Sequence, residues 1–151
     1  MALDLDILAS GRAKSAAESQ LALSYLARAR DAGRALGFAS FALEEADERK
    51  PQKMIDTCTA TTLLVALDER GKSLSSEGIA RQLSAWRDAG ETRALFVIGG
   101  ADGLPREVKD CARLTLAFCG QTWPHLLVRA MLAEQLYRAM TILSVHPYHR
   151  S

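Results

Sequence analysis

The stretch RALFVI at Arg93–Ile98 decides the fold class of this chain. Every residue after Arg93 in it is apolar, so a strand formed here meets no water on either face, and the stretch stops at the glycine-rich run Gly99–Gly103. Strands that are apolar on both faces are typical of parallel sheets with helices packed on each side. Thr62–Leu67 (TLLVAL) has the same character. The two stretches predict the centre of an α/β sheet.

Further strands and helices are expected on both sides of these stretches, because apolar residues recur with strand or helix spacing between Gly and Pro boundaries. The expected strands are Leu3–Ala9, Phe38–Leu43 and Ala112–Phe118; the expected helices are Ala13–Leu36, Lys53–Ala60, one capped by Ser75 and ended by Gly90, a short one from Pro105 to Asp110, and His125–Leu143. Alternating strands and helices predict a five- to six-stranded, mostly parallel sheet with helices on both faces, in three layers. We expect Asp68–Gly71 to close the strand that ends at Leu67, and the acidic residues around Glu45 to be solvated.

Length and composition indicate the kind of protein that this chain forms. The chain has 151 residues, 48% of them hydrophobic and 25% charged, which predicts one domain over residues 1–151 with a sizeable core. The net charge of +1 gives no strong field for a polyanion, but residues 105–151 hold six Arg or Lys against three acids, so an anionic partner should meet the C-terminal third.

The longest low-charge stretch, Thr57–Ala66, is too short to span a bilayer, and the N-terminus lacks the pattern of a secretory signal. We therefore expect a cytoplasmic protein without a membrane segment.

The three cysteines, Cys58, Cys111 and Cys119, are odd in number and lack CxxC spacing, which predicts reduced thiols and no disulfide. His146 and His149 form an HxxH pattern, but Pro147 prevents a helical presentation and no further ligands complete a set, so no metal site is expected.

Three loops are candidates for ligand binding, because ligands of open parallel sheets bind beyond the carboxyl ends of the strands. They follow Leu67, Ile98 and Phe118. The loop Gly99–Gly103 matches neither GxGxxG nor a Walker A sequence, so its glycines indicate either close approach to a ligand or simply a turn.

The tail His146–Arg150 (HPYHR) gathers two imidazoles, a phenol and a guanidinium, groups that can bind phosphate or a flat base. Glu134 and Arg138 are spaced to face each other on the preceding helix, where a surface ion pair and a functional pair are both consistent with the spacing.

Four segments in one order resemble the small bacterial 23S rRNA pseudouridine N3-methyltransferases of the SPOUT (α/β-knot) superfamily: LVALDERGKSLSSE (64–77), FVIGGADGL (96–104), QTWPHLLVRAMLAEQLYRA (121–139) and HPYHR (146–150). The N-terminal third is similar more loosely, with Gly11 and Lys14 at the usual Gly-x-x-Lys positions. Between Leu43 and Thr62 the chain is shorter than typical members and carries acidic residues in place of their basic stretch.

The resemblance implies a deep trefoil knot over about residues 64–143 with the tail 144–151 beyond it, a homodimer, and S-adenosylmethionine bound in the knot. The implied cofactor-binding positions are Leu67, Gly100, Cys119, Gly120, Gln121, Thr122, Trp123 and Pro124. They fall in the three loops that the strand-end argument selects.

The implied reaction moves a methyl group from the sulfonium of the cofactor to N3 of a pseudouridine in 23S rRNA, which requires removal of the N3 proton. His149 is suited to accept this proton, and Arg138 or Arg150 is suited to stabilise the negative charge that develops on the base. Tyr148 lies beside them in the sequence. Because the charge is near neutral, the expected substrate is the assembled ribosome rather than naked RNA. Two alternatives remain open at this point: a SPOUT methyltransferase acting on another RNA such as tRNA, and a catalytically silent knot dimer that binds RNA or a nucleotide.

Overall fold

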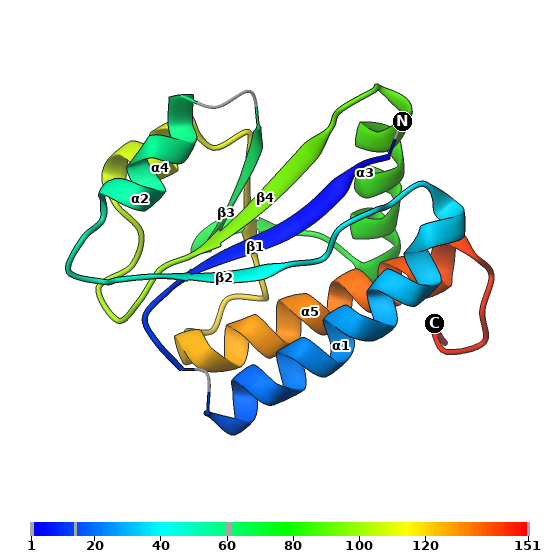
Figure 1. The fold of residues 1–151 in the computed structure, drawn as a ribbon, viewed down its shortest axis with the longest axis horizontal. Helices are drawn as coiled ribbons and strands as arrows, with labels where there is room; N and C mark the ends of the chain where they lie inside the picture. Colours follow the sequence, from blue (N-terminus) through cyan, green and yellow to red (C-terminus); the bar gives the residue numbers. More distant parts are fainter. Residues whose placement is uncertain (1, 14, 60–61, 151) are drawn as a thin grey trace.

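The computed structural model describes residues 2–13, 15–59 and 62–150. Within these ranges, five strands form one parallel sheet in the order β2-β1-β4-β3-β5 (Figure 1). The elements in chain order are β1 (Asp4–Ser10), α1 (Ala17–Gly33), η1 (Arg34–Leu36), β2 (Leu43–Ala46), α2 (Gln52–Ile55), η2 (Asp56–Thr59), β3 (Leu63–Ser73), α3 (Ser76–Asp88), β4 (Arg93–Ile98), α4 (Arg106–Cys111), β5 (Leu114–Ala117) and α5 (His125–Leu143). The predicted α/β sheet is confirmed.

Two hydrophobic clusters fill the space on the two faces of the sheet. Alternate residues of β1, β3 and β4 point to opposite faces, as strand geometry requires. One cluster packs Leu5 and Phe96 against α1, α3 and α5, and the other packs Leu8 and Val97 against the side that carries α2 and α4. This arrangement is the predicted three-layer architecture.

Helices α1 and α5 lie side by side along one face (Figure 1), with the rings of Tyr25 and Tyr137 in contact at 6.1 Å between centroids. Helix α1 ends as predicted: η1 continues to Leu36, and Gly37 has a φ of 88°. Such left-handed backbone favours glycine. Helix α3 begins where Ser75 accepts a hydrogen bond from the Gly78 amide, which is the cap that the sequence predicts.

The second strand lies later in the chain than predicted. Phe38–Leu43 is the expected range, whereas β2 covers Leu43–Ala46. The segment before it still runs beside β1, since Leu5 and Ile7 donate backbone hydrogen bonds to Ser40 and Ala42. The alternating apolar residues therefore indicated a real neighbour of β1, but only its acidic end has regular ladder pairing.

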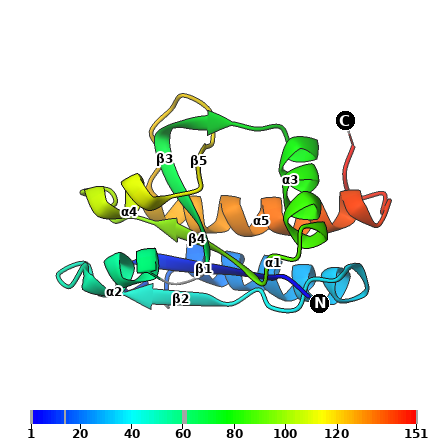
Figure 2. The ribbon, with the colours of Figure 1, turned by 90° about the horizontal axis from the view of Figure 1, so that it is seen from above.

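The prediction that Asp68–Gly71 closes the third strand is wrong. β3 pairs with β5 up to Leu67, shifts register, and pairs with β5 again at Lys72 and Ser73. Figure 2 shows the second half of β3 bending away from the sheet and running toward α3. Gly71 lies against β5 at this bend, where an added Cβ would be 2.7 Å from the carbonyl oxygen of Thr115. The polar sequence of this segment gives no sign of the second pairing, because the pairing depends on a strand more than forty residues later.

The short elements differ in detail from the prediction. Lys53–Ala60 is expected as one helix, whereas the structure has the short helix α2 followed by the 3-10 turn η2. Ala60, at the end of this predicted helix, and Lys14 lie outside the described residues.

The acidic end of β2 is solvated as predicted at Glu44, which is exposed, but not at Glu45, which pairs with a buried arginine. The Arg129 side chain is 1% exposed and that of Glu45 is 12% exposed, and Arg129 Nη1 lies 2.6 Å from Glu45 Oε2. Arg129 Nη2 also donates to the carbonyl oxygens of Ser10 and Gly11, and Glu45 accepts from the amide of Ala13. The interaction ties α5 to the ends of β1 and β2.

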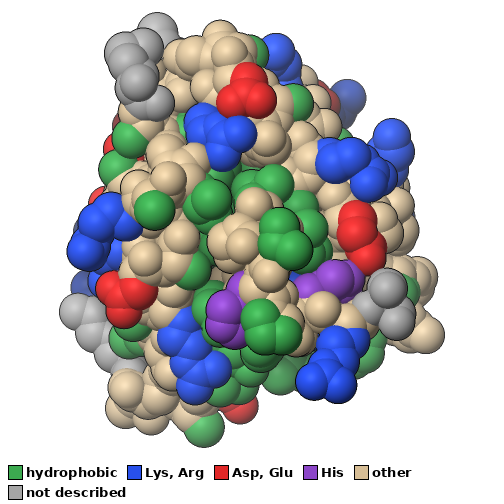
Figure 3. Space-filling model, turned by 90° about the vertical axis from the view of Figure 1, so that its right-hand side faces the viewer, with side chains coloured by type: hydrophobic (Ala, Val, Ile, Leu, Met, Phe, Trp, Pro, Cys, Tyr) green, Lys and Arg blue, Asp and Glu red, His purple; other side chains and the backbone are tan. Residues whose placement is uncertain are grey.

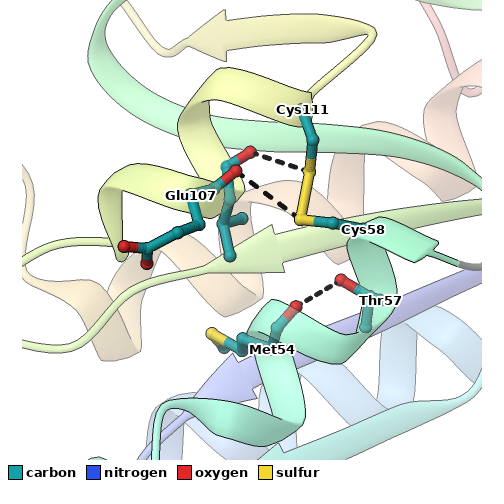
Figure 4. The surroundings of a disulfide bond; sticks show 6 residues. Met54, Thr57, Cys58, Glu107 and Cys111 are labelled. Carbon is teal, nitrogen blue, oxygen red and sulfur yellow. Dashed lines mark hydrogen bonds between the residues drawn. A yellow bond between two sulfur atoms is a disulfide. The ribbon is translucent and has the colours of Figure 1, made fainter.

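The prediction of three reduced thiols is wrong for two of the cysteines. Cys58 of η2 and Cys111 at the end of α4 form a disulfide, with their Cα atoms 5.9 Å apart (Figure 4). Cys119 is free and exposed. The two bonded cysteines are 53 positions apart, and only the packing of η2 beside α4 brings them together.

Among the described residues, no helix is long and apolar enough to cross a membrane. The same ranges contain no group of three or more His, Cys, Asp or Glu side chains placed to hold a metal ion.

Candidate functional site

A cavity of about 490 Å³ opens at the bend of β3 and at the carboxyl ends of β4 and β5, beside the start of α5. The segments that follow Leu67, Ile98 and Phe118, which the sequence predicts as ligand-binding loops, all contribute to its wall; the first of them is the bent continuation of β3 and not a loop. The cavity is lined by Leu67, Asp68, Glu69, Arg70, Ile98, Gly99, Gly100, Ala101, Asp102, Gly103, Leu104, Lys109, Leu116, Ala117, Phe118, Gln121, Thr122, Trp123, Pro124, His125 and Val128. The lining combines apolar strand ends with charged and main-chain polar groups, which is typical of small-molecule sites.

The turn Gly99–Gly103, with three glycines among its five residues, forms one wall of the cavity. The amide of Gly103 donates to the carbonyl oxygen of Gly100 at 3.0 Å, and Gly103 has a φ of 80°. An added Cβ on Gly99 would lie 2.7 Å from the Leu104 nitrogen, so the turn closes only with glycine there. An added Cβ on Gly100 would instead meet the Glu48 carboxylate, at 2.7 Å from its Oε1.

The loop between β5 and α5 is held in place by two side chains near its C-terminal end, which reach the start of the loop and β3. Trp123 Nε1 donates to the carbonyl oxygen of Phe118 at 2.7 Å, and the Thr122 hydroxyl donates to the Glu69 carboxylate. Cys119 has a φ of 66° at the start of this loop. Of the six predicted positions between 119 and 124, the last four line the cavity, whereas Cys119 and Gly120 do not.

Charged residues that the sequence analysis places in a turn also line the cavity. Asp68 Oδ1 accepts from the Arg70 amide at 2.9 Å, and Asp68 Oδ2 lies 3.3 Å from Lys109 Nζ. The backbone hydrogen bond, followed by the bond and charge of Lys109, lowers the pKa of Asp68 below its usual value of 3.8. The signal in the sequence was the position of Asp68 and Glu69 directly after a buried strand.

The predicted catalytic residues form a second cluster on α5 and the tail. Arg138 donates to Glu134 from Nε at 2.8 Å and from Nη2 at 2.6 Å, and its guanidinium lies 4.9 Å from the centre of the Tyr148 ring. The ion pair raises the pKa of Arg138. His149 contacts Arg138 through Nδ1 at 3.2 Å and Glu77 through Nε2 at 2.7 Å. The hydrogen bond from His149 lowers the pKa of Glu77.

Tyr148 is anchored within this cluster, and Arg150 is not. The Tyr148 hydroxyl donates to Glu134 at 3.2 Å, and burial together with a bond to Tyr25 raises the pKa of Tyr148 to about 12. Arg150 is exposed at the end of the tail. Figure 3 looks onto this end of the molecule, where histidine side chains lie among apolar ones and basic side chains surround them.

The cavity and the tail cluster lie at opposite ends of α5. Val128 lines the cavity, and Arg138 follows ten residues later, which places it about 15 Å along the helix axis. Figure 1 shows the start of α5 beside the carboxyl ends of the strands and the tail at the other end. Within one copy of the chain, the two predicted sets of site residues are therefore not brought together.

Comparison with known proteins identifies the family. A family model described as predicted SPOUT methyltransferase matches residues 3–149. The ribosomal RNA large subunit methyltransferase H of Rhodopseudomonas palustris (strain BisB18) is 47% identical, with 96% of this chain and 98% of that protein covered. The protein of the same name from Beijerinckia indica is 47% identical, with 97% and 99% covered.

A solved structure supports the fold. A probable methylase family protein from Haemophilus influenzae superposes with a TM-score of 0.53 at 10% identity, covering 99% of this chain and 70% of that one. Together with the family model and the close relatives, the sheet order and the strand-end cavity lead to one conclusion. This chain belongs to the SPOUT methyltransferase family.

Proposed function

We propose that this protein is an S-adenosylmethionine-dependent methyltransferase that methylates N3 of a pseudouridine in the 23S rRNA of the assembled ribosome, in the cytoplasm. Relatives that match it over nearly their whole length are named ribosomal RNA large subunit methyltransferase H. The observation that carries the proposal is the cavity built from the ends of three strands and the start of α5.

The cavity fits S-adenosylmethionine. Its volume of about 490 Å³ lies in the range of roughly 300–1,000 Å³ that is usual for ligand sites. A flat adenine can pack against the apolar side chains of Leu67, Ile98 and Leu116. A positively charged ligand can interact with the carboxylates of Asp68 and Glu69. The cofactor would be held by Leu67, Gly100, Gln121, Thr122, Trp123 and Pro124. Cys119 and Gly120 would shape the loop that precedes α5.

When bound, the cofactor supplies a methyl group on a positively charged sulfur. The protein must then hold N3 of the pseudouridine about 3 Å from that methyl group and favour loss of the N3 proton. Arg138 and the exposed Arg150 are the groups that stabilise the negative charge left on the base carbonyls, because a guanidinium stays protonated and donates in a fixed plane. The Tyr148 ring supplies a face for stacking against RNA bases.

The distance along α5 supports a homodimer in which the tail of one protomer completes the cavity of the other. A second copy can supply Tyr148, His149 and Arg150 where the first copy supplies the cofactor pocket, since twofold contacts place different ends of two molecules together. We place the deep trefoil knot of the family in the same region, over about residues 64–143.

A mixing experiment tests the shared site. One protein carries His149→Ala and Arg150→Ala, and the other carries Gly99→Val, which opens the turn that forms the cavity wall; each is expected to be inactive alone. Mixed dimers isolated with two different tags should regain up to half of the wild-type activity, because one of their two sites joins an intact cavity to an intact tail. Background activity would show that each tail serves its own protomer.

Two further measurements separate the alternatives. Calorimetry with S-adenosylmethionine that shows no binding would favour a silent RNA-binding module. Mapping of N3-methylpseudouridine in 23S rRNA from a deletion strain should show loss of the modification. An unchanged rRNA map together with cofactor binding would point to another RNA, such as tRNA.

A further inference from the structure

His149 of the tail is held between two helices that are distant in the sequence. Its Nε2 lies 2.7 Å from Glu77 Oε1 in the first turn of α3, and its Nδ1 lies 3.2 Å from Arg138 Nη1 on α5. The side chain is 17% exposed, so neighbouring groups rather than water hold the ring.

The two contacts determine which nitrogen carries the proton. An arginine guanidinium has only N–H donors, so Nδ1 of His149 must accept the hydrogen bond from Arg138 and is unprotonated. Nε2 then carries the hydrogen and donates it to the Glu77 carboxylate. In this arrangement both ring nitrogens are occupied, and His149 does not accept the N3 proton of a substrate.

The same contacts fix the guanidinium of Arg138. Glu134 accepts from its Nε and Nη2, His149 accepts from its Nη1, and the Tyr148 ring lies over its face. The Arg138 side chain remains 25% exposed, which leaves an edge available to an anionic group. The direction of that edge depends on where the His149 ring lies, and the ring position depends on the hydrogen bond to Glu77.

We propose that Glu77 is a positioning residue of the methyltransferase site: it accepts the Nε2–H of His149 and so holds the ring in place, and His149 in turn orients Arg138 toward the substrate base. The inference rests on the proposed function. The carboxylate acts as a hydrogen-bond acceptor, so an amide at the same position should serve and a methyl group should not.

The experiment compares Glu77→Ala with Glu77→Gln in the full-length protein. Both variants remove the same negative charge from the start of α3, so their difference isolates the hydrogen bond to His149. Glu77→Ala should lower kcat for methylation of ribosomes by on the order of tenfold, while the calorimetric Kd for S-adenosylmethionine stays unchanged. Glu77→Gln should retain most of the wild-type kcat. Asp88→Ala at the other end of α3 is the matched control and should leave kcat unchanged.

A second measurement reads the state of the His149 ring without using activity. The ¹⁵N chemical shifts of the ring, assigned by their loss in His149→Ala, should show an unprotonated Nδ1 and a protonated Nε2 in the wild type and in Glu77→Gln. In Glu77→Ala the Nε2–H has lost its acceptor, so the Nε2 shift should change and the Nδ1 contact with Arg138 should loosen. Wild-type kcat in Glu77→Ala, or unchanged ¹⁵N shifts there, would overturn the positioning role. A wild-type protein that binds the cofactor but methylates no ribosome would instead overturn the proposed function, whatever the spectra show.

Discussion

Arg129 is the most deeply buried charged side chain among the described residues, and its environment explains why it is tolerated. Its guanidinium meets one carboxylate and two backbone carbonyl oxygens, so most of its donors have partners. Removing one member of a buried ion pair typically costs about 3–5 kcal/mol, because the remaining charge stays buried without a counter-charge.

We expect Arg129→Ala to lower the free energy of unfolding by about 3–5 kcal/mol in urea titrations. Arg106→Ala, which removes an exposed partner of Asp110 on α4, should change it by less than about 1 kcal/mol. The double variant Arg129→Met/Glu45→Leu should recover part of the loss, because no isolated charge is left. Equal effects of Arg129→Ala and Arg106→Ala would contradict the importance of this pair.

Asp68 should make stability depend on pH at the acid end. Its pKa is lowered in the folded protein, so its charged form stabilises the fold above about 3.8 and this contribution is lost as the pH falls through the lower folded value. The melting temperature of the wild type should exceed that of Asp68→Asn at pH 6, and the difference should shrink toward pH 3. Asp110→Asn on exposed α4 is the control. A difference that stays constant between these pH values would rule out the carboxylate as its source.

At the scale of elements, the second pairing of β3 with β5 builds one side of the cavity. Gly71→Val should force β3 away from Thr115, because a side chain there meets backbone atoms that cannot move independently. We expect S-adenosylmethionine to bind roughly tenfold or more weakly in calorimetry, equivalent to about 1.4 kcal/mol. Ser73→Val adds the same side chain at an exposed neighbour and should bind normally. Equal affinities of the two variants would show that the cavity does not need this pairing.

The Cys58–Cys111 disulfide joins η2 to α4 and closes a long loop. A loop of this length corresponds to about 4 kcal/mol in the chain-entropy treatment, so Cys58→Ser should lower the melting temperature by roughly 10 °C without reductant. Cys119→Ser should have little effect. Thiol titration of the denatured wild type should find one thiol before reduction and three after it. Equal melting temperatures of wild type and Cys58→Ser without reductant would mean that the bond contributes nothing.

The sequence alone predicts those elements whose formation depends on residues that are neighbours in the chain. The buried stretch up to Leu67, the strand that ends at Ile98, the Ser75 cap and the stop at Gly37 all depend on neighbouring residues. All are confirmed, although β3 itself continues to Ser73. The loops beyond the strand ends could also be placed, because the carboxyl ends of parallel strands share one edge. Three features could not be predicted: the pairing of Glu45 with Arg129, the disulfide, and the second pairing of β3 with β5. Each joins segments more than forty residues apart. Glu77 was missed for the same reason: it appears as a normal acid at a helix start until the tail reaches it.

The whole molecule carries a net charge of only +1, which limits how it can bind RNA. Tight binding to naked RNA requires several phosphate contacts and depends strongly on salt. We expect methyl incorporation into assembled ribosomes to exceed incorporation into protein-free 23S rRNA by at least about tenfold at physiological salt, where phosphate contacts are weakened. Efficient methylation of a short isolated rRNA hairpin would contradict this.

The contact between α1 and α5 has a consequence for how the protein is made. These are the first and last long helices of the chain, and β1 lies inside the sheet while β5 forms its edge. During synthesis, the apolar side of α1 leaves the ribosome long before α5 exists to cover it, so the N-terminal half emerges without a complete core. Contacts between such distant segments also slow the search for the native state. The core on this face of the sheet is therefore expected to form only once α5 has been synthesised and has left the ribosome.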